Sequence, residues 1–457
     1  MSFPMSSGEP EKPRGSRRIY ESVRDLARFD AAEQWAVLAY LVKWIVLGSI
    51  VGVLAGLGSA AFLTSLDWAT RTREAHSWLL FGLPLAGLVT GLGYHYRGGR
   101  SVEGNNLIID EIHDPKAWIP RRMAPFIFVA TILTHLFGGS AGREGTAIQM
   151  AGSLTDGAFR TRRISSADRR LLLIAAIAGG FGSVFGVPLA GCVFALEVQS
   201  LGRLRYDALV GALSASVVGD LVVRGLGVHH TLTPQLGKVD MTVSLFAKVM
   251  LAGLVFGLVA LAFSELVHGI KTVFATSVRW VPARPLIGGC LIVGLTYLVG
   301  TRDYLGLSTP LVTRSLAGGA GIVLFAFALK LLFTAVTLGS GFQGGEVTPL
   351  FVMGATAGAT LGRVLDAPVP LMAALGFVAV FAAAANTPLA CTVMAVELFG
   401  ASNIVFFAVA CVIAYVASAH RGIYTSQRVD TPKSAAGEGS GGETLESLAR
   451  RRRPWLR

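Results

Sequence analysis

The sequence PLAGCVFALE at residues 188–197 returns as PLACTVMAVE at residues 388–397, an offset of 200 residues (388 − 188). Six of the ten positions are identical. A second pair of motifs, GREGT at residues 142–146 and GGEVT at residues 344–348, occurs in the same order, with an offset of 202 between their glutamates (346 − 144). Two motifs repeated at nearly one offset indicate two related halves. In transporters such halves are often inverted and hold the substrate between them, but the repeat alone does not reveal their direction.

Composition around these motifs defines the class of protein. Of the 457 residues, 53% are hydrophobic and only 15% are charged, whereas an ordinary soluble domain has about 25% charged residues. Mean hydropathy is +0.59. This balance argues against a soluble enzyme, a disordered chain and a nucleic-acid-binding protein, despite the net charge of +12. The sequence therefore predicts an all-α polytopic membrane protein.

Four cysteines lie inside apolar runs: Cys192, Cys290, Cys391 and Cys411. They are interpreted as small buried hydrophobic residues, because neither a disulfide framework nor a metal-ligand spacing is present in the sequence. We therefore expect no cofactor and no metal.

The apolar segments are unequal in length. Many are shorter than the roughly 20 residues of a spanning helix, and several contain Gly or Pro. This pattern predicts broken and re-entrant helices, which are tolerated only where they are buried in protein or line a cavity. The two halves are expected at about residues 35–227 and 245–425. The predicted apolar segments are 35–66, 78–96, 125–139, 146–159, 171–198, 208–227, 245–267, 285–300, 320–341, 348–362, 371–399 and 401–419.

Charge at the two ends predicts topology. Residues 1–34 contain no early apolar stretch, so a cleavable signal peptide is not expected. Both tails and the loop at residues 160–170 are rich in arginine, and the positive-inside rule then places both termini in the cytoplasm, with an even number of crossings. Residues 1–34 and 426–457 are thus predicted as cytoplasmic tails of a membrane domain spanning 35–425. The arginines concerned are Arg14, Arg17, Arg18, Arg160, Arg162, Arg163, Arg169, Arg170 and Arg450 to Arg453.

The first glycine-rich break, LFGGSAGREGT, covers residues 136–146. A helix that starts after it would present free N–H groups and the positive end of its dipole to an anion. Glu144 lies in this break, and an intramembrane carboxylate is by default a functional candidate. When charged it would compete with the anion, and when protonated it would be neutral. The alternative is a helix-start glutamate paired with Arg143.

The second break, GSGFQGGEVTP, covers residues 339–349. Thr348 is expected to cap the next helix and Pro349 to lie in its first turn. Glu346 is then a second carboxylate at membrane depth. It is either a proton-relay group or gate, or a structural glutamate satisfied by amides.

Several weaker signals lie elsewhere. Asn105 and Asn106, at a predicted helix start, could cap it and offer amide donors to an anion. Glu197 and Glu397 end the two Pro-Leu-Ala helices and are interpreted as structural residues that face the cytoplasmic boundary. Tyr424 follows the last apolar run, where a tyrosine is usually an interfacial anchor.

These motifs resemble those of the CLC family of chloride channels and proton-coupled anion antiporters. Residues 142–145 match the family's Gly-Arg-Glu-Gly-Pro motif, residues 341–349 its second glycine-rich motif, and residues 422–424 the segment that carries its central tyrosine. Motif order and spacing agree over roughly residues 35–425.

The resemblance implies a homodimer with one pore per subunit, each subunit built from inverted halves. It also implies that Glu144 is the gating glutamate, that backbone amides near residues 143–145 and 346–347 line the anion path, and that the Tyr424 hydroxyl faces the inner anion. The predicted anion path comprises Asn105, Asn106, Gly142, Arg143, Gly145, Thr146, Gly345, Val347, Thr348 and Tyr424, with Glu144 and Glu346 as gating and proton groups.

Four departures from the chloride-type pattern point to one branch of the family. The anion-coordinating serine is absent from residues 104–108, and Thr146 replaces the proline after Gly-Arg-Glu-Gly. Val198 occupies the position of the inner proton glutamate, and Glu346 a position that is apolar in chloride members. These changes resemble the fluoride/proton antiporter clade, in which a glutamate at the Glu346 position takes part in coupled movement. The short segment after Tyr424 suggests a prokaryotic form in the cell membrane.

The leading hypothesis is therefore a fluoride/proton antiporter that exports fluoride by using proton influx. The second is a chloride/proton antiporter or a passive chloride channel on the same scaffold. The expected partners are a small inorganic anion, protons, the lipid bilayer and a second copy of the chain, and not nucleic acid. An intramembrane enzyme is not expected, because the only histidine near Ser140 is His135, interpreted as a satisfied helix histidine. A transporter of organic solutes would need a larger pocket.

Overall fold

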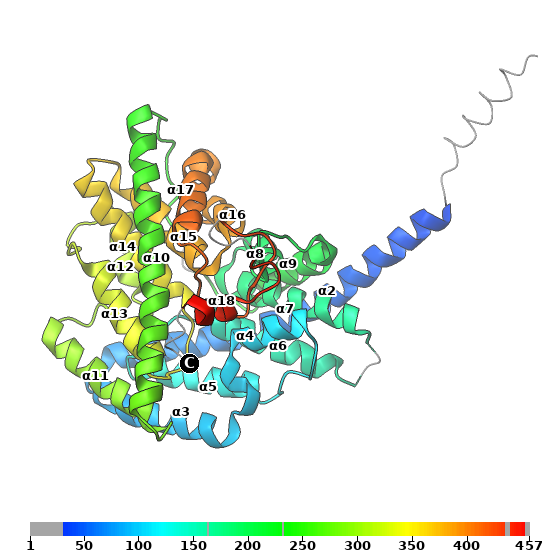
Figure 1. Ribbon diagram of the computed structural model, residues 1–457, viewed down its shortest axis with the longest axis horizontal. Coiled ribbons are helices and arrows are strands. Elements are labelled where there is room, and N and C mark those ends of the chain that lie inside the picture. The colour runs from blue at the N-terminus through cyan, green and yellow to red at the C-terminus, as the bar shows by residue number, and fades with distance from the viewer. Residues whose placement is uncertain (1–30, 162–163, 231–232, 435–438, 453–457) are drawn as a thin grey trace, which may run out of the picture.

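The computed structural model describes residues 31–161, 164–230, 233–434 and 439–452 (Figure 1). Apart from the short strands β1 (Ser200–Leu201) and β2 (Arg428–Val429), the regular structure is helical. The predicted tail up to residue 30 lies outside the described residues, as do Arg162, Arg163 and Arg453.

The helices fall into the two predicted halves. The first half contains α2 (Ala31–Ala75), α3 (Leu83–Arg97), α4 (Asn105–His113), α5 (Met123–Leu136), α6 (Glu144–Phe159), α7 (Ser166–Phe185), α8 (Pro188–Glu197) and α9 (Leu209–Gly225). The second contains α10 (Val243–Ser277), α11 (Ala283–Val299), α12 (Thr309–Leu316), α13 (Ala326–Gly339), α14 (Val347–Val364), α15 (Val369–Ala385), α16 (Pro388–Phe399) and α17 (Ile404–Ala417). The helix α18 (Leu445–Arg452) follows them.

Helix lengths confirm the prediction of broken helices. Within the described residues, four helical stretches are long and apolar enough to cross a membrane: Glu33–Ala75, Ser77–Arg97, Tyr206–Gly225 and Val243–Ser277. Seven further apolar helices among the described residues have only 10–17 residues, too short to span a bilayer by themselves. Among the long helices, α2 and α10 are the longest (Figure 1).

Two predicted segments are each divided in the structure. The segment 171–198 forms α7 and α8, which are separated at Gly186, and the segment 371–399 forms α15 and α16, which are separated at Asn386. Gly186 has φ +74° and Asn386 has φ +60°, the left-handed conformation that ends helices. In each half a proline then opens the next helix, since its missing N–H is not needed in a first turn.

The Pro-Leu-Ala helices α8 and α16 cap each other. The Glu197 carboxylate accepts hydrogen bonds from the backbone N–H groups of Leu389 (3.1 Å) and Ala390 (2.8 Å). The Glu397 carboxylate accepts the equivalent bonds from Leu189 (2.9 Å) and Ala190 (2.7 Å). The end of each helix thus lies at the start of the other, so the two helices are antiparallel.

This arrangement corrects the interpretation of Glu197 and Glu397 as residues that both face the cytoplasmic boundary. In an antiparallel pair the two carboxylates lie at opposite ends of the helices. Both glutamates are structural, but each accepts hydrogen bonds from the helix start of the other half. The two halves are therefore inverted relative to each other.

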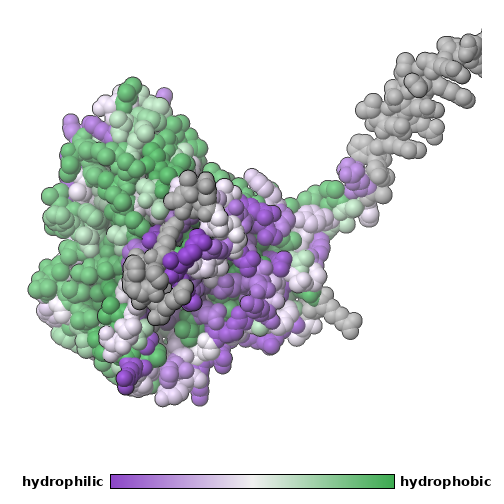
Figure 2. Space-filling model, in the orientation of Figure 1, coloured by the Kyte–Doolittle hydropathy of each residue, from purple (hydrophilic) through white to green (hydrophobic). Residues whose placement is uncertain are grey.

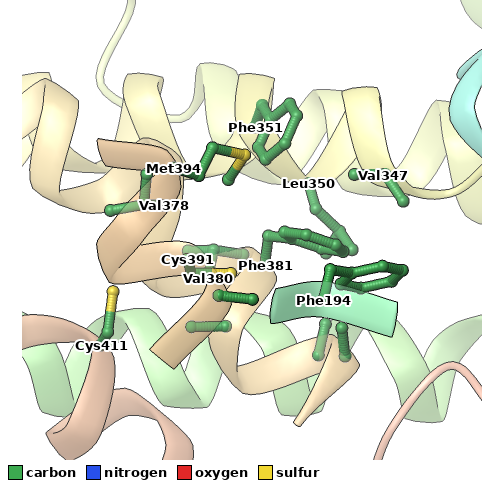
Figure 3. Close-up of a cluster of buried hydrophobic side chains, with 14 of the residues drawn as sticks. Phe194, Val347, Leu350, Phe351, Val378, Val380, Phe381, Cys391, Met394 and Cys411 are labelled. Atoms are coloured by element: carbon green, nitrogen blue, oxygen red, sulfur yellow. The ribbon is translucent and has the colours of Figure 1, made fainter. Parts of the chain in front are cut away.

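The core between the halves is aromatic and closely packed (Figure 3). Phe194 of the first half lies 5.7 Å from Phe381 of the second, between ring centroids. Helices α14 and α15 approach through glycines: a Cβ on Gly354 would lie 2.0 Å from the carbonyl oxygen of Gly376. Small residues allow this approach between membrane helices, where dispersion forces drive association.

Cys192, Cys391 and Cys411 are buried, as predicted, but Cys290 on α11 is exposed. The prediction for Cys290 was wrong because an apolar run in a membrane protein can face outward. The same helix also exposes Leu291 and Leu298.

The arginine-rich loop contributes one residue to the interior. Arg169 donates two hydrogen bonds to the Asp156 carboxylate (2.7 and 2.8 Å) and one to Glu111 (3.0 Å). Its guanidinium also lies over the Trp118 ring, 4.8 Å from the centroid. Arg169 thus joins α7 to α4 and α6, a packing role that its place in a basic loop did not reveal.

The chain continues to pack after the predicted domain end at residue 425. Strand β2 pairs in parallel with β1. Leu445 and Leu448 of α18 then pack on Leu201 and Val429, and all four side chains are buried. Figure 2 shows that hydrophilic residues gather over α18, α4 and α7, while hydrophobic residues cover α10, α13 and α14.

The reciprocal caps generate a stability prediction. We expect Glu197→Ala to lower the free energy of unfolding by about 2 kcal/mol, because two N–H groups of α16 lose a charged acceptor. The measurement is thermal unfolding of the purified protein in detergent. Asp67→Ala is the matched control, since Asp67 forms an exposed pair with Arg71 at 2.7 Å and such pairs contribute little. Equal unfolding temperatures for the two variants would contradict the capping role.

Candidate functional site

The two glycine-rich breaks meet through their backbones. The N–H of Gly142 donates to the carbonyl oxygen of Gly345 (2.6 Å), and the N–H of Gly345 donates to that of Gly142 (2.8 Å). A Cβ on Gly345 would lie 2.9 Å from the backbone nitrogen of Gly145, so only glycine permits this approach. The starts of α6 and α14 are thereby held together, and both direct N–H groups and positive dipole ends into one region.

Glu144 is fully buried between these helix starts. Its Oε2 accepts hydrogen bonds from the backbone N–H groups of Arg143 (3.1 Å) and Thr348 (3.0 Å). Its Oε1 accepts one from the Thr348 hydroxyl (2.5 Å) and lies 3.5 Å from Nε of Arg143. The carboxylate therefore occupies a set of donors that would suit a free anion.

Thr348 does not cap its helix as predicted. Helix α14 begins at Val347, and its N-cap residue is Glu346. Thr348 is inside the first turn, where its hydroxyl can reach across to Glu144. The prediction failed because the partner comes from the other half, 204 residues away.

Asn105 and Asn106 differ in their surroundings. The N-cap of α4 is Gly104, with φ +62°, and neither asparagine is the cap. A Cβ on Gly145 would lie 2.9 Å from Nδ2 of Asn105, so this amide lies directly against the start of α6. The Oδ1 of Asn106 instead accepts a hydrogen bond from the N–H of Ser426 (3.1 Å).

Tyr424 and Thr146 are both buried and differ in their hydrogen bonding. The Tyr424 hydroxyl has no hydrogen-bond partner in the part of the chain that the structure describes, and its ring packs edge-on against Phe194, 6.5 Å away. The Thr146 hydroxyl pairs with Thr131 of α5 at 2.8 Å. The Thr146 side chain is therefore turned toward α5.

A cavity of about 1090 Å³ extends to Glu346. Glu346 is half-buried and lines it, whereas Glu144 does not. Helix α18 forms part of its wall. Other lining residues include Asn106, Lys271, Phe342, Arg421 and Glu446.

A buried lysine lies behind the first break. Lys330 of α13 has no exposed surface, and its Nζ donates to the Ser140 hydroxyl (2.9 Å), the Ser308 hydroxyl (2.9 Å) and the carbonyl oxygens of Tyr304 (3.2 Å) and Gly306 (2.8 Å). All four acceptors are neutral, so these bonds supply no counter-charge to the amine. Sequence reasoning missed Lys330, although a lysine inside an apolar helix was a visible signal.

His135 and Ser140 do not form a nucleophile and base. The ring nitrogens of His135 lie 2.9 Å from the carbonyl oxygen of Thr131 and 3.1 Å from that of Ala141. Ser140 bonds Lys330 and Thr334 instead.

Comparison with known proteins shows which family this chain resembles. The family described as voltage gated chloride channel matches residues 85–419. A chloride/fluoride channel protein of Pseudomonas syringae pv. tomato is 45% identical over 416 residues, which cover 89% of this chain and 91% of that protein. An H(+)/Cl(-) exchange transporter ClcA of Salmonella newport is 26% identical, and the match covers 78% of this chain and 80% of that protein.

Solved structures agree with these relatives. The crystal structure of a CLC-type fluoride/proton antiporter has a TM-score of 0.82 and 34% identity, and the match covers 85% of this chain and 98% of that chain. The structure of a slow cyanobacterial Cl-/H+ antiporter has a TM-score of 0.70 at 20% identity, covers 90% of this chain and 97% of that one, and supports the fold alone. The family, the relatives and the fold all agree with the resemblance of the motifs, and the chain belongs to the CLC family of integral membrane channels and transporters.

Proposed function

We propose that the protein is a fluoride/proton antiporter that exports fluoride by using proton influx. The observation that carries the proposal is the pair of carboxylates at the two breaks: Glu144 sits in a set of anion donors, and Glu346 lines the cavity. A relative at 45% identity is named a chloride/fluoride channel protein, and a structure at 34% identity is a fluoride/proton antiporter. Both support the proposal.

Glu144 couples the two ions by competition. Its carboxylate uses the N–H groups of Arg143 and Thr348 and the Thr348 hydroxyl. A fluoride ion needs the same donors, so it binds there only after Glu144 has left. Protonation removes the charge that holds Glu144 in place, and the neutral side chain exchanges with the anion.

Selectivity for fluoride follows from the donors. Fluoride is small and strongly hydrated, so the site has to replace its water with short, strong hydrogen bonds. Asn105 supplies an amide against the start of α6, where chloride members carry a serine. The Tyr424 hydroxyl is buried and unpartnered within the described residues, and so is free to donate to an anion.

Glu346 is the proton group on the cavity side. Val198 leaves the usual inner proton position apolar and is itself buried. Glu346 lines the cavity and is the N-cap residue of α14, whose residue Thr348 binds Glu144. Protons enter Glu346 or leave it through the cavity and pass between it and Glu144.

A chloride/proton antiporter or a passive chloride channel is the second candidate. The ClcA relatives, at 26–27% identity, favour it. This second candidate differs from the fluoride/proton antiporter in one measurable respect. In it, replacing Glu346 would leave transport unchanged.

We propose further that the protein lies in the cell membrane of a prokaryote with both termini in the cytoplasm. The arginine-rich ends support this orientation. A homodimer is proposed from the family resemblance, with lipid covering the remaining apolar surface.

The gating role predicts the behaviour of Glu144→Ala. With purified protein in liposomes, an imposed fluoride gradient should no longer move protons, because the side chain that carries them is gone. Fluoride itself should still move. The measurement is external pH during fluoride efflux, with Asp67→Ala as a control that keeps coupling. Proton movement at the unmodified rate in Glu144→Ala would exclude the gating role.

Ion preference is a separate prediction. Under equal gradients, fluoride efflux from liposomes should exceed chloride efflux, as followed with ion-selective electrodes. Asn105→Ala should reduce the fluoride rate more than the chloride rate, since it removes an amide donor. Equal fluoride and chloride rates in the unmodified protein would reject the fluoride assignment and leave the second candidate.

The proton role of Glu346 predicts that Glu346→Gln loses most fluoride/proton exchange. Glutamine keeps the shape and hydrogen bonding but carries no exchangeable acid, so the variant should fold and elute at the same volume in size-exclusion chromatography. Glu103→Gln is the control, because Glu103 also lines the cavity but pairs loosely with Arg100 at 3.9 Å. If both variants exchange at the unmodified rate, Glu346 is structural.

A further inference from the structure

We propose that Gln427 is a positioning residue that fixes the Tyr424 hydroxyl in the anion path. This inference rests on the proposed function, because it assumes that Tyr424 donates to the transported anion. Gln427 lies beyond the predicted domain end, in the segment that joins the membrane helices to β2. It is nevertheless fully buried.

The side chain of Gln427 joins the two halves. Its Nε2 donates to the carbonyl oxygens of Val198 (2.6 Å) and Ala385 (2.8 Å), and its Oε1 accepts from Nδ2 of Asn386 (2.9 Å). Val198 is the C-cap of α8, and Ala385 is the last residue of α15. Carbonyls at helix ends lack partners within their helix. Gln427 therefore satisfies one such group from each half.

The backbone of Gln427 holds Tyr424 directly. Its N–H donates to the carbonyl oxygen of Tyr424 (3.2 Å) and closes a four-residue turn. On the other side of the tyrosine, the N–H of Ile423 donates to the carbonyl oxygen of Ala384 (2.9 Å). Within the turn, the N–H of Ser426 donates to Oδ1 of Asn106 (3.1 Å). The tyrosine backbone is thus fixed to the same helix end that Gln427 binds.

The phenol hydroxyl has no hydrogen bond among the described residues that would hold it, although the ring is packed in the core. Phe194 contacts the ring only at an edge. The place of the hydroxyl is therefore set by the backbone turn and not by a bond of its own. Because hydrogen bonds weaken steeply with distance and angle, a small shift of the turn is enough to remove the hydroxyl from a fluoride ion.

A merely structural role for Gln427 makes a different prediction. If its bonds only stabilise the fold, their loss lowers the thermal unfolding temperature and the fraction of active protein, and so lowers kcat. Loss of positioning instead raises the KM for fluoride. The KM should then change only while the Tyr424 hydroxyl is present.

A double-mutant cycle separates these roles. The full chain is reconstituted in liposomes, and initial fluoride efflux is measured against fluoride concentration for Tyr424→Phe, Gln427→Ala and the double variant. We expect each single variant to raise the KM about tenfold, the effect of one lost hydrogen bond to an ion, and the double variant to match Tyr424→Phe. Gln199→Ala is the control, because Gln199 is equally buried and next to Val198, but its amide bonds Ala195 of the preceding helix α8. Its KM should not change.

The outcomes distinguish the two proposals. An unchanged KM in Tyr424→Phe would contradict the role of Tyr424 in the proposed function. A raised KM in Tyr424→Phe, with an unchanged KM in Gln427→Ala or with multiplying effects in the double variant, would overturn the positioning role alone. If Gln427→Ala does not fold, Gln427→Asn is used under the same criteria, since a shorter amide cannot reach both carbonyls without moving the turn.

Discussion

The pair of hydrogen bonds between Gly142 and Gly345 is the contact on which the rest of the site depends. Irregular backbone at membrane depth must find its partners inside the protein, because lipid offers none. Each glycine-rich break supplies the partner for the other, so neither break can be understood alone. The junction then determines which helix starts face each other, and those starts hold Glu144.

Charge is distributed around this junction in an unusual way. Lys330 is buried against neutral oxygens behind the first break, while Glu144 is buried among backbone and hydroxyl donors beside the Arg143 guanidinium. An uncompensated buried charge is costly, so each of these two groups depends on the hydrogen bonds that surround it. Glu144 is the anion that the protein itself provides. A transported anion replaces it without changing the net charge of the region.

The sequence predicted the features that repeat and missed those that depend on contacts across the repeat. The two Pro-Leu-Ala motifs and the two glycine-rich breaks were visible at a fixed offset, and they define the halves and the position of Glu144. Thr348 was expected to cap its own helix because only its neighbours in the chain were known. Glu197, Glu397 and Gln427 were misread or overlooked for the same reason, since their partners lie 41 to 229 positions away. Cys290 shows a further limit: an apolar run does not say whether it faces protein or lipid.

The exchange of caps between α8 and α16 has a consequence for how the chain is made. The N–H groups at the start of α8 are satisfied by Glu397, which leaves the ribosome about 200 residues after them. Until then the first half has a helix end without acceptors, and it cannot complete its own structure as it enters the membrane. The first half therefore reaches its final hydrogen bonding only after the second half has been synthesised. A chain that ends between the halves would leave the N–H groups at the start of α8 without their Glu397 acceptor.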